Sequence, residues 1–136
     1  MLEAYRAAEP DTTATLGAGA KLFRVVGRGV GRDGRGEWSL VACAGSDSVS
    51  FLESATDCRA TRACGIAGCA SLADRRPMVD SDAAVQIAFV SDDVTVKYDL
   101  SLVDSAAAPS KLAWSIVRSG TLESRSVDAT SGALLP

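Results

Sequence analysis

Four cysteines are the residues of this chain best suited to chemistry, because a thiolate can attack an electrophile, bind a metal or form a disulfide. They are Cys43, Cys58, Cys64 and Cys69. No two of them form a Cys-x-x-Cys pair, which disfavours a zinc site or a thioredoxin-like redox site. An even number of cysteines favours disulfides in an oxidising compartment. Four reduced, buried thiols are the alternative, and the sequence does not choose among the possible pairings.

Most other catalytic chemistry is excluded by composition. The 136-residue chain has no histidine, so it holds no Ser-His-Asp triad, no Cys-His dyad and no HExxH zinc site. No pair of carboxylates is placed for acid–base catalysis, and the acidic residues around Asp92 and Asp93 lack the spacing of a calcium-binding EF-hand. A hydrolase with a cysteine or aspartate nucleophile has no supporting pattern. We therefore expect a protein that is not an enzyme and that uses no metal or cofactor.

A glycine-rich segment fits the dinucleotide-binding pattern GxGxxG from Gly29 to Gly34. A helix must follow such a loop, because the helix N-terminus binds the pyrophosphate. Here the residues from Glu37 onward have the character of a strand. The Asp33-Gly34 pair is typical of a hairpin, so we expect a hairpin loop without a cofactor.

Arginines make two predicted loops basic. The net charge of −3 and the placement of the aromatic residues in predicted core strands argue against a nucleic-acid partner. In the glycine-rich loop, we expect Arg28, Arg32 and Arg35 to be solvated. If the basic residues bind anything, an acidic surface of a protein partner is the expected target. The candidate contacts in the second loop are Arg59, Arg62, Arg75 and Arg76.

Periodicity predicts two short helices and several strands. Apolar spacing predicts helices over residues 2–9 and 83–89, the second capped by Asp80 or Ser81. Strict alternation predicts a strand from Val94 to Leu102, with one buried and one wet face. Shorter patterns predict strands over 22–26, 38–43, 49–52, 112–116 and 122–127. Residues 54–79 show no period, and we expect a loop that the cysteines hold in place.

The two halves of the chain share an order of features. Each half contains a Trp-Ser-aliphatic-Val string, at residues 38–41 and 114–117, and a later Ala-Thr pair, at 55–56 and 129–130. A short helix precedes each string, and a glycine turn follows it. This order predicts two repeats, each with a helix on a curved antiparallel sheet, which share one core. The two tryptophans are expected in that core.

The second half resembles the PepSY and PepSY-like family. The family's closing valine–aspartate–alanine–x–x–glycine turn fits Val127, Asp128, Ala129 and Gly132. The resemblance covers residues 80–136. Residues 1–57 look like a degenerate copy that lacks the closing glycine, and residues 58–79 form a Cys-rich connecting loop outside the family pattern. The resemblance implies an α+β, cystatin-like fold, in which short helices pack on an antiparallel sheet in two repeats.

Compartment and role follow from these expectations. The family resemblance implies a bacterial, extracytoplasmic, non-enzymatic domain, which agrees with the cysteines. The start of the chain has no signal-peptide pattern, so we expect a periplasmic or secreted domain from which the signal has been removed. No apolar run approaches the ~20 residues of a membrane-spanning helix. We expect an inhibitor-like or other protein-binding module that acts through an exposed sheet face or the 54–79 loop. The alternative is a self-assembling shell or surface component.

Overall fold

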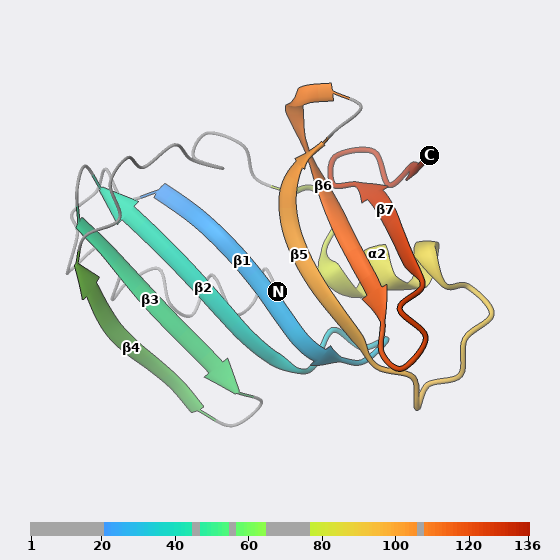
Figure 1. The fold of residues 1–136 in the computed structure, drawn as a ribbon, viewed down its shortest axis with the longest axis horizontal. Coiled ribbons are helices and arrows are strands. Elements are labelled where there is room, and N and C mark those ends of the chain that lie inside the picture. The colour runs from blue at the N-terminus through green and yellow to red at the C-terminus, as the bar shows by residue number, and fades with distance from the viewer. Residues whose placement is uncertain (1–20, 45–46, 55–56, 65–76, 106–107) are drawn as a thin grey trace.

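The computed structural model describes residues 21–44, 47–54, 57–64, 77–105 and 108–136. These residues form one eight-stranded antiparallel sheet with one helix (Figure 1). The strands of the first half are β1 (Lys21–Val30), β2 (Glu37–Ala44), β3 (Asp47–Ser54) and β4 (Asp57–Cys64). The second half holds α2 (Ser81–Ala88), β5 (Tyr98–Ser105), β6 (Ala108–Arg118), β7 (Ser124–Asp128) and β8 (Leu134–Leu135).

The strand order is symmetric about the centre of the sheet. It reads β4-β3-β2-β1-β5-β6-β7-β8, so each half begins at the centre and runs outward to an edge. At the centre Val26 pairs with Ser101, and the flanking pairs are Val25 with Leu102 and Gly27 with Leu100. An approximate two-fold axis through the Val26–Ser101 pair therefore relates β1 to β5.

The two tryptophan strings occupy equivalent strands in this arrangement. Trp38 on β2 pairs with Glu53 on β3, and Trp114 on β6 pairs with Val127 on β7. In the sequence, each of these pairing residues stands two positions before the alanine of an Ala-Thr pair. The strand pairing thus gives the same correspondence as the sequence strings. The division of the chain at residues 57 and 80 stays a prediction.

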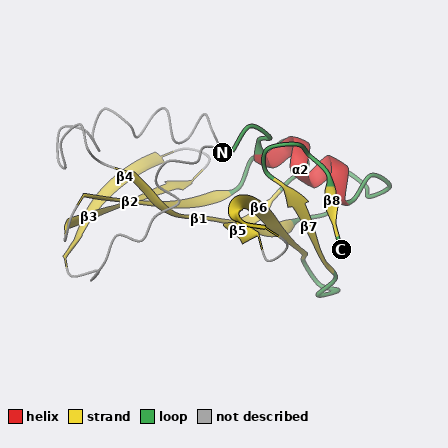
Figure 2. Ribbon diagram, turned by 90° about the horizontal axis from the view of Figure 1, so that it is seen from above, coloured by secondary structure: helices red, strands yellow, loops and turns green. Residues whose placement is uncertain are grey.

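One face of the sheet packs on α2 to form the core. Trp38 and Trp114 are buried as predicted, with 3% and 0% of their surface exposed. Asp80 caps the helix and its carboxylate accepts a hydrogen bond from the Ser81 N–H, which confirms the predicted start. The buried apolar residues of α2 and its C-cap are Ala84, Val85, Ala88 and Phe89, and they join the tryptophans in one cluster. Figure 2 shows α2 lying on one side of the sheet over the strands of the second half.

The predicted α+β fold, cystatin-like with short helices packed on the sheet in two repeats, is wrong. The described chain is mostly an open antiparallel sheet, and its single helix is eight residues long. An antiparallel sheet is stable with one face open to water, so a helix is not needed over every strand. The helix expected at residues 2–9 lies outside the described residues.

Two further boundaries differ from the predictions. β4 takes up residues 57–64, where a connecting loop was expected; the polar–apolar alternation in its sequence, Asp-Cys-Arg-Ala-Thr-Arg-Ala-Cys, is broken at Arg62 and spans too few residues to mark the strand. The strand predicted from Val94 begins only at Tyr98. The Asp93 carboxylate accepts a hydrogen bond from the Thr95 N–H at 2.9 Å, and this local turn competes with the strand. Val94 is consequently 76% exposed.

Candidate functional site

The turn that resembles the PepSY motif closes the second half and is held by its own hydrogen bonds. The Asp128 carboxylate accepts bonds from the N–H groups of Thr130, at 2.9 Å, and Ser131, at 2.7 Å. These bonds hold the pKa of Asp128 below its ordinary value of 3.8. Gly132 has φ +76° and its N–H donates to the Asp128 carbonyl at 2.9 Å. The aspartate and the glycine are thus required by the geometry of the turn.

The same turn anchors the segment that leads into α2. The Ala129 carbonyl accepts bonds from the N–H groups of Met78 and Val79, at 2.8 and 2.9 Å. The indole Nε1 of Trp114 donates to the Val79 carbonyl at 2.8 Å. Val127 and Ala129 are fully buried in the core. The predicted motif residues Val127, Asp128, Ala129 and Gly132 therefore come together as a structural joint, with their polar groups used inside the fold.

The C-terminal end of α2 is surrounded by arginines, which suits the partial negative charge of that end. From the glycine-rich hairpin, the Arg32 guanidinium donates from Nη1 to the carbonyls of Phe89, Val90 and Asp92, at 3.0, 3.3 and 2.5 Å. The expectation that Arg32 is solvated is therefore wrong. The spacing of the sequence gave no signal for this contact, because hairpin and helix end are far apart along the chain.

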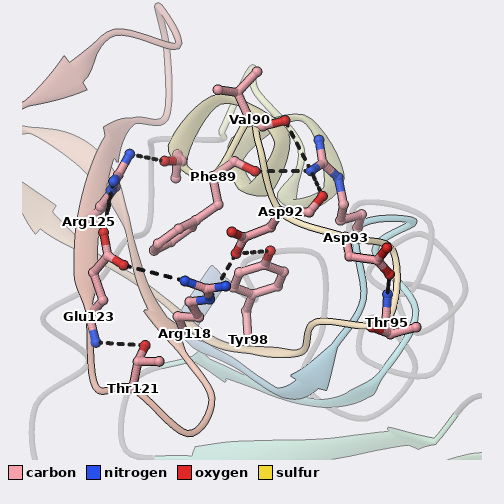
Figure 3. A network of polar contacts seen from close by, with 12 residues as sticks. Phe89, Val90, Asp92, Asp93, Thr95, Tyr98, Arg118, Thr121, Glu123 and Arg125 are labelled. Carbon is pink, nitrogen blue, oxygen red and sulfur yellow. Dashed lines mark hydrogen bonds and ion pairs between the residues drawn. The ribbon is translucent and has the colours of Figure 1, made fainter.

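Two more arginines approach the helix end from the β6–β7 hairpin (Figure 3). Arg125 donates to the Ala88 carbonyl at 2.6 Å, and its guanidinium lies 4.8 Å from the centre of the Phe89 ring. Glu123 accepts from Arg125 at 2.8 Å and lies 3.8 Å from Arg118. Cations and carboxylates thus alternate around the helix end, and each is held by a protein group.

Asp92 links this network to the core. Its Oδ2 accepts a hydrogen bond from the Tyr98 hydroxyl at 2.8 Å and lies 3.0 Å from Nε of Arg118. Burial, followed by the hydrogen bond and the charge of Asp92, raises the pKa of Tyr98 to about 12. The phenol is therefore neutral at physiological pH and acts as a fixed donor. We interpret the network as a helix-end clamp, in which these side chains bond to the carbonyls of the helix end and to one another.

Asp99 and the glycine-rich loop have local roles. Asp99 accepts a hydrogen bond from the Gly29 N–H at 3.0 Å, across the central strand pair. The glycine-rich segment is a hairpin loop between β1 and β2, as predicted, and a strand follows it. Within the described ranges, no group of three or more cysteine or acidic side chains is arranged to hold a metal ion.

The face of the sheet opposite α2 carries a row of small side chains across five strands. Register aligns Ser126 with Ser115, Ser115 with Ser101, Ser101 with Val26, and Val26 with Ser39. Each residue alternates along its strand with a core residue, so its side chain points away from α2. We call this surface the open face; it comprises Val26, Ser39, Ser101, Val103, Ser115, Val117 and Ser126.

The open face is partly exposed, and its side chains are all small. Val103 is 40% exposed, and the other six side chains are partly exposed. None is larger than valine, and charged residues lie at both ends of the face: Asp99 and Arg28 pair with Val117 and Glu37 at one end, and Arg24 pairs with Val41 at the other. Binding of small molecules favours concave pockets, whereas a smooth surface of this kind suits a broad protein surface. The sequence signal for this face is the alternation of apolar and small or polar residues along the strand that contains Trp114.

The other predicted site residues are only partly placed. Cys43 lies on β2, and the second strand out from it, β4, carries Cys58 and Cys64 together with Arg59 and Arg62. The side chains of these five residues lie outside the described part of the structure. The same holds for Cys69, Arg75 and Arg76 as a whole, so their expected roles in disulfides and partner contact stay predictions.

Comparison with known proteins shows the fold and no family. No family model matches the chain, and no curated protein matches its sequence. The PepSY resemblance is thus not confirmed. A crystal structure of a "putative lipoprotein" from Clostridium difficile 630 is similar, with a TM-score of 0.67 over 97% of this chain and 90% of that chain. The sequences are 12% identical, so the likeness concerns the fold alone. No helix in the described part of this chain combines the length and apolar character needed to cross a membrane.

Proposed function

We propose that this protein is a non-enzymatic, extracytoplasmic module that binds another protein through the open face of its sheet. The observation that carries the proposal is the transverse row Ser39–Val26–Ser101–Ser115–Ser126, which spans five strands with no bulky side chain. A partner surface can approach the backbone closely along this row. Valines on the same face supply apolar area, and serine hydroxyls supply donors and acceptors.

The absence of enzymatic function is supported by how the reactive groups are used. Asp92, Tyr98 and Arg118 bond to one another, and Asp128 bonds to its own turn. A catalytic acid or base must reach a substrate proton, and these groups are already directed at protein atoms. The extracytoplasmic setting is supported by the cysteine content and by the fold shared with a clostridial protein whose name is that of a lipoprotein.

The test is capture of a partner from the envelope and secreted fractions of the native host. Tagged wild-type protein is compared with a Ser101→Arg/Ser126→Arg variant, which places two long cations on the row, on strands β5 and β7 that are not neighbours. Ser119→Arg is the matched control, because Ser119 is an exposed serine in the β6–β7 turn outside the open face. All three proteins should unfold at similar temperatures.

The expected result is one protein retained by the wild type and the Ser119→Arg control and lost at least tenfold with the double variant. Retention by all three proteins alike would contradict use of the open face. Capture of no protein from either fraction would contradict the partner-binding function itself.

A further inference from the structure

Three of the four cysteines lie on strands whose spacing keeps them apart. Cys43 is on β2, Cys58 and Cys64 are on β4, and β3 lies between these strands with an unbroken register to each. Neighbouring strands are about 4.8 Å apart, so Cα atoms on β2 and β4 are separated by at least about 9 Å. Cys58 and Cys64 stand six positions apart on one strand, which is about 20 Å.

No disulfide can join any two of these three residues within one chain. A disulfide requires Cα atoms about 4.4–6.8 Å apart, and pairs beyond about 7 Å cannot be bridged without movement of the backbone. One internal bridge at most can form, and it must include Cys69. At least two cysteines per chain are therefore left without an internal disulfide partner.

Two of the three cysteines, Cys58 and Cys64, lie on an edge strand of the sheet. β4 is the outermost strand of the first half, and all eight of its residues pair with β3. The opposite edge, β8, is two residues long. A long edge strand presents a row of backbone donors and acceptors that another strand can use. Among the described strands, β4 is thus the one suited to pairing with a further strand.

We propose that β4 pairs antiparallel with β4 of a second copy of this chain, and that two disulfides lock the pair. Thr61 lies midway between Cys58 and Cys64. A two-fold axis at Thr61 places Cys58 of each copy opposite Cys64 of the other. Directly opposite residues in an antiparallel pair have Cα atoms about 4.5–5.5 Å apart, which is within disulfide range.

The same register avoids repulsion between the copies. It sets Arg59 opposite Ala63 and Arg62 opposite Ala60, so no arginine directly faces an arginine. Like charges directly opposite one another would destabilise a strand pair. The occupant that fits this edge is therefore another copy of the same strand, and the product is a closed dimer with one continuous sheet.

The covalent step is disulfide exchange with a small-molecule or protein disulfide as the oxidant. A Cys58 thiolate attacks the oxidant, which releases one thiol and leaves a mixed disulfide. The Cys64 thiolate of the other copy then displaces the second thiol. Each new bridge consumes two thiols and one oxidant disulfide, and yields two reduced oxidant thiols. The locking of the dimer relies on the oxidising setting of the proposed function, whereas the strand pairing does not.

The test uses the full chain with Cys43→Ser and Cys69→Ser, so that only Cys58 and Cys64 are left. The purified protein is equilibrated with oxidised and reduced glutathione, and the covalent mass and free thiols are measured in denaturant. The expected product is a dimer in which the two thiols per chain have fallen to none. A monomer, with two free thiols or with an internal bridge, would overturn the proposal.

Complementation fixes the register. In the same background, a Cys58→Ser chain and a Cys64→Ser chain should each show no covalent dimer in denaturant, because every surviving cysteine then faces a serine. Mixed together, they should form a heterodimer through one bridge. Covalent dimers of either single variant alone, or no covalent heterodimer on mixing, would contradict the Thr61-centred pairing. The glutathione buffer makes this result independent of the compartment and of the open face.

Discussion

The rings of Trp38 and Trp114 meet edge to face, with centroids 6.4 Å apart and planes inclined at 70°. They come from β2 and β6, which flank the central strand pair on opposite sides. The indole nitrogens donate in different directions, to the Gly34 carbonyl at 3.0 Å and to the Val79 carbonyl at 2.8 Å. One aromatic contact thus joins the two halves of the sheet, the β1–β2 hairpin and the segment before α2.

The first prediction concerns this contact. In a double-mutant cycle with Trp38→Leu and Trp114→Leu, the free energies of unfolding should show a favourable coupling of about 0.5–1.5 kcal/mol, the usual contribution of an aromatic pair beyond its burial. Urea denaturation of the four proteins measures it. Additive effects of the two substitutions would show that the halves fold without this contact.

The second prediction concerns Arg32 at the end of α2. Arg32→Met should lower the free energy of unfolding by about 1–3 kcal/mol, because carbonyls of the helix end lose a charged donor. Arg35→Met is the matched control from the same hairpin. Arg35 has a side chain that is 84% exposed, and its ion pair with Asp33 is 3.9 Å long, so a change below about 0.5 kcal/mol is expected. Equal losses of unfolding free energy in the two variants would show that the contacts of Arg32 with the end of α2 do not stabilise the fold.

The third prediction is a pH dependence from Asp128. Backbone hydrogen bonds lower its pKa in the folded protein below the ordinary 3.8, so ionised Asp128 stabilises the fold above pH 3.8 and this stabilisation is lost as the pH falls through the folded pKa. Asp128→Asn keeps an oxygen acceptor but has no titration. The difference in thermal midpoint between wild type and variant should be constant near neutrality and shrink below pH 3.8. A difference that does not change with pH would contradict this role.

The fourth prediction concerns the ionisation of Tyr98 at alkaline pH. The pKa of Tyr98 is raised from 10.0 to about 12, so its contribution to stability is complete below pH 10 and is lost as the pH rises toward 12. In a Tyr5→Phe background, the phenolate absorbance then reports Tyr98 alone, and it should appear near pH 12 and together with unfolding. Titration near pH 10 in the folded protein would show that Tyr98 is neither buried nor bonded to Asp92.

Local patterns were enough to predict the parts of the fold that local energetics determine. The Asp80 cap, the helix that follows, the hairpin at Asp33-Gly34 and the buried tryptophans are each encoded within a few neighbouring residues. The fold class failed because it depended on a family resemblance and on an aperiodic segment. Residues 57–64 form a strand through pairing with β3, a contact that alternation along β4 itself does not reveal.

The helix-end network was missed for a similar reason. Arg32 lies on the β1–β2 hairpin and Arg118 and Arg125 lie on the β6–β7 hairpin, and only the packing of α2 on the sheet brings the two hairpins to the same helix end. The open face could be predicted in part, because the polar residues of an alternating strand must face away from the core. Its continuity across five strands depends on the register between neighbouring strands, and the sequence strings around the tryptophans do not determine that register by themselves.

Site-directed photo-crosslinking in the native host tests the central claim most directly. A photo-reactive side chain replaces Ser115 at the centre of the open face, and the same group at Ser119 serves as the control. Protein binding through the open face predicts a covalent product with one other protein from position 115 and none from position 119. Equal labelling from both positions, or no product from position 115, would contradict the proposed interaction surface.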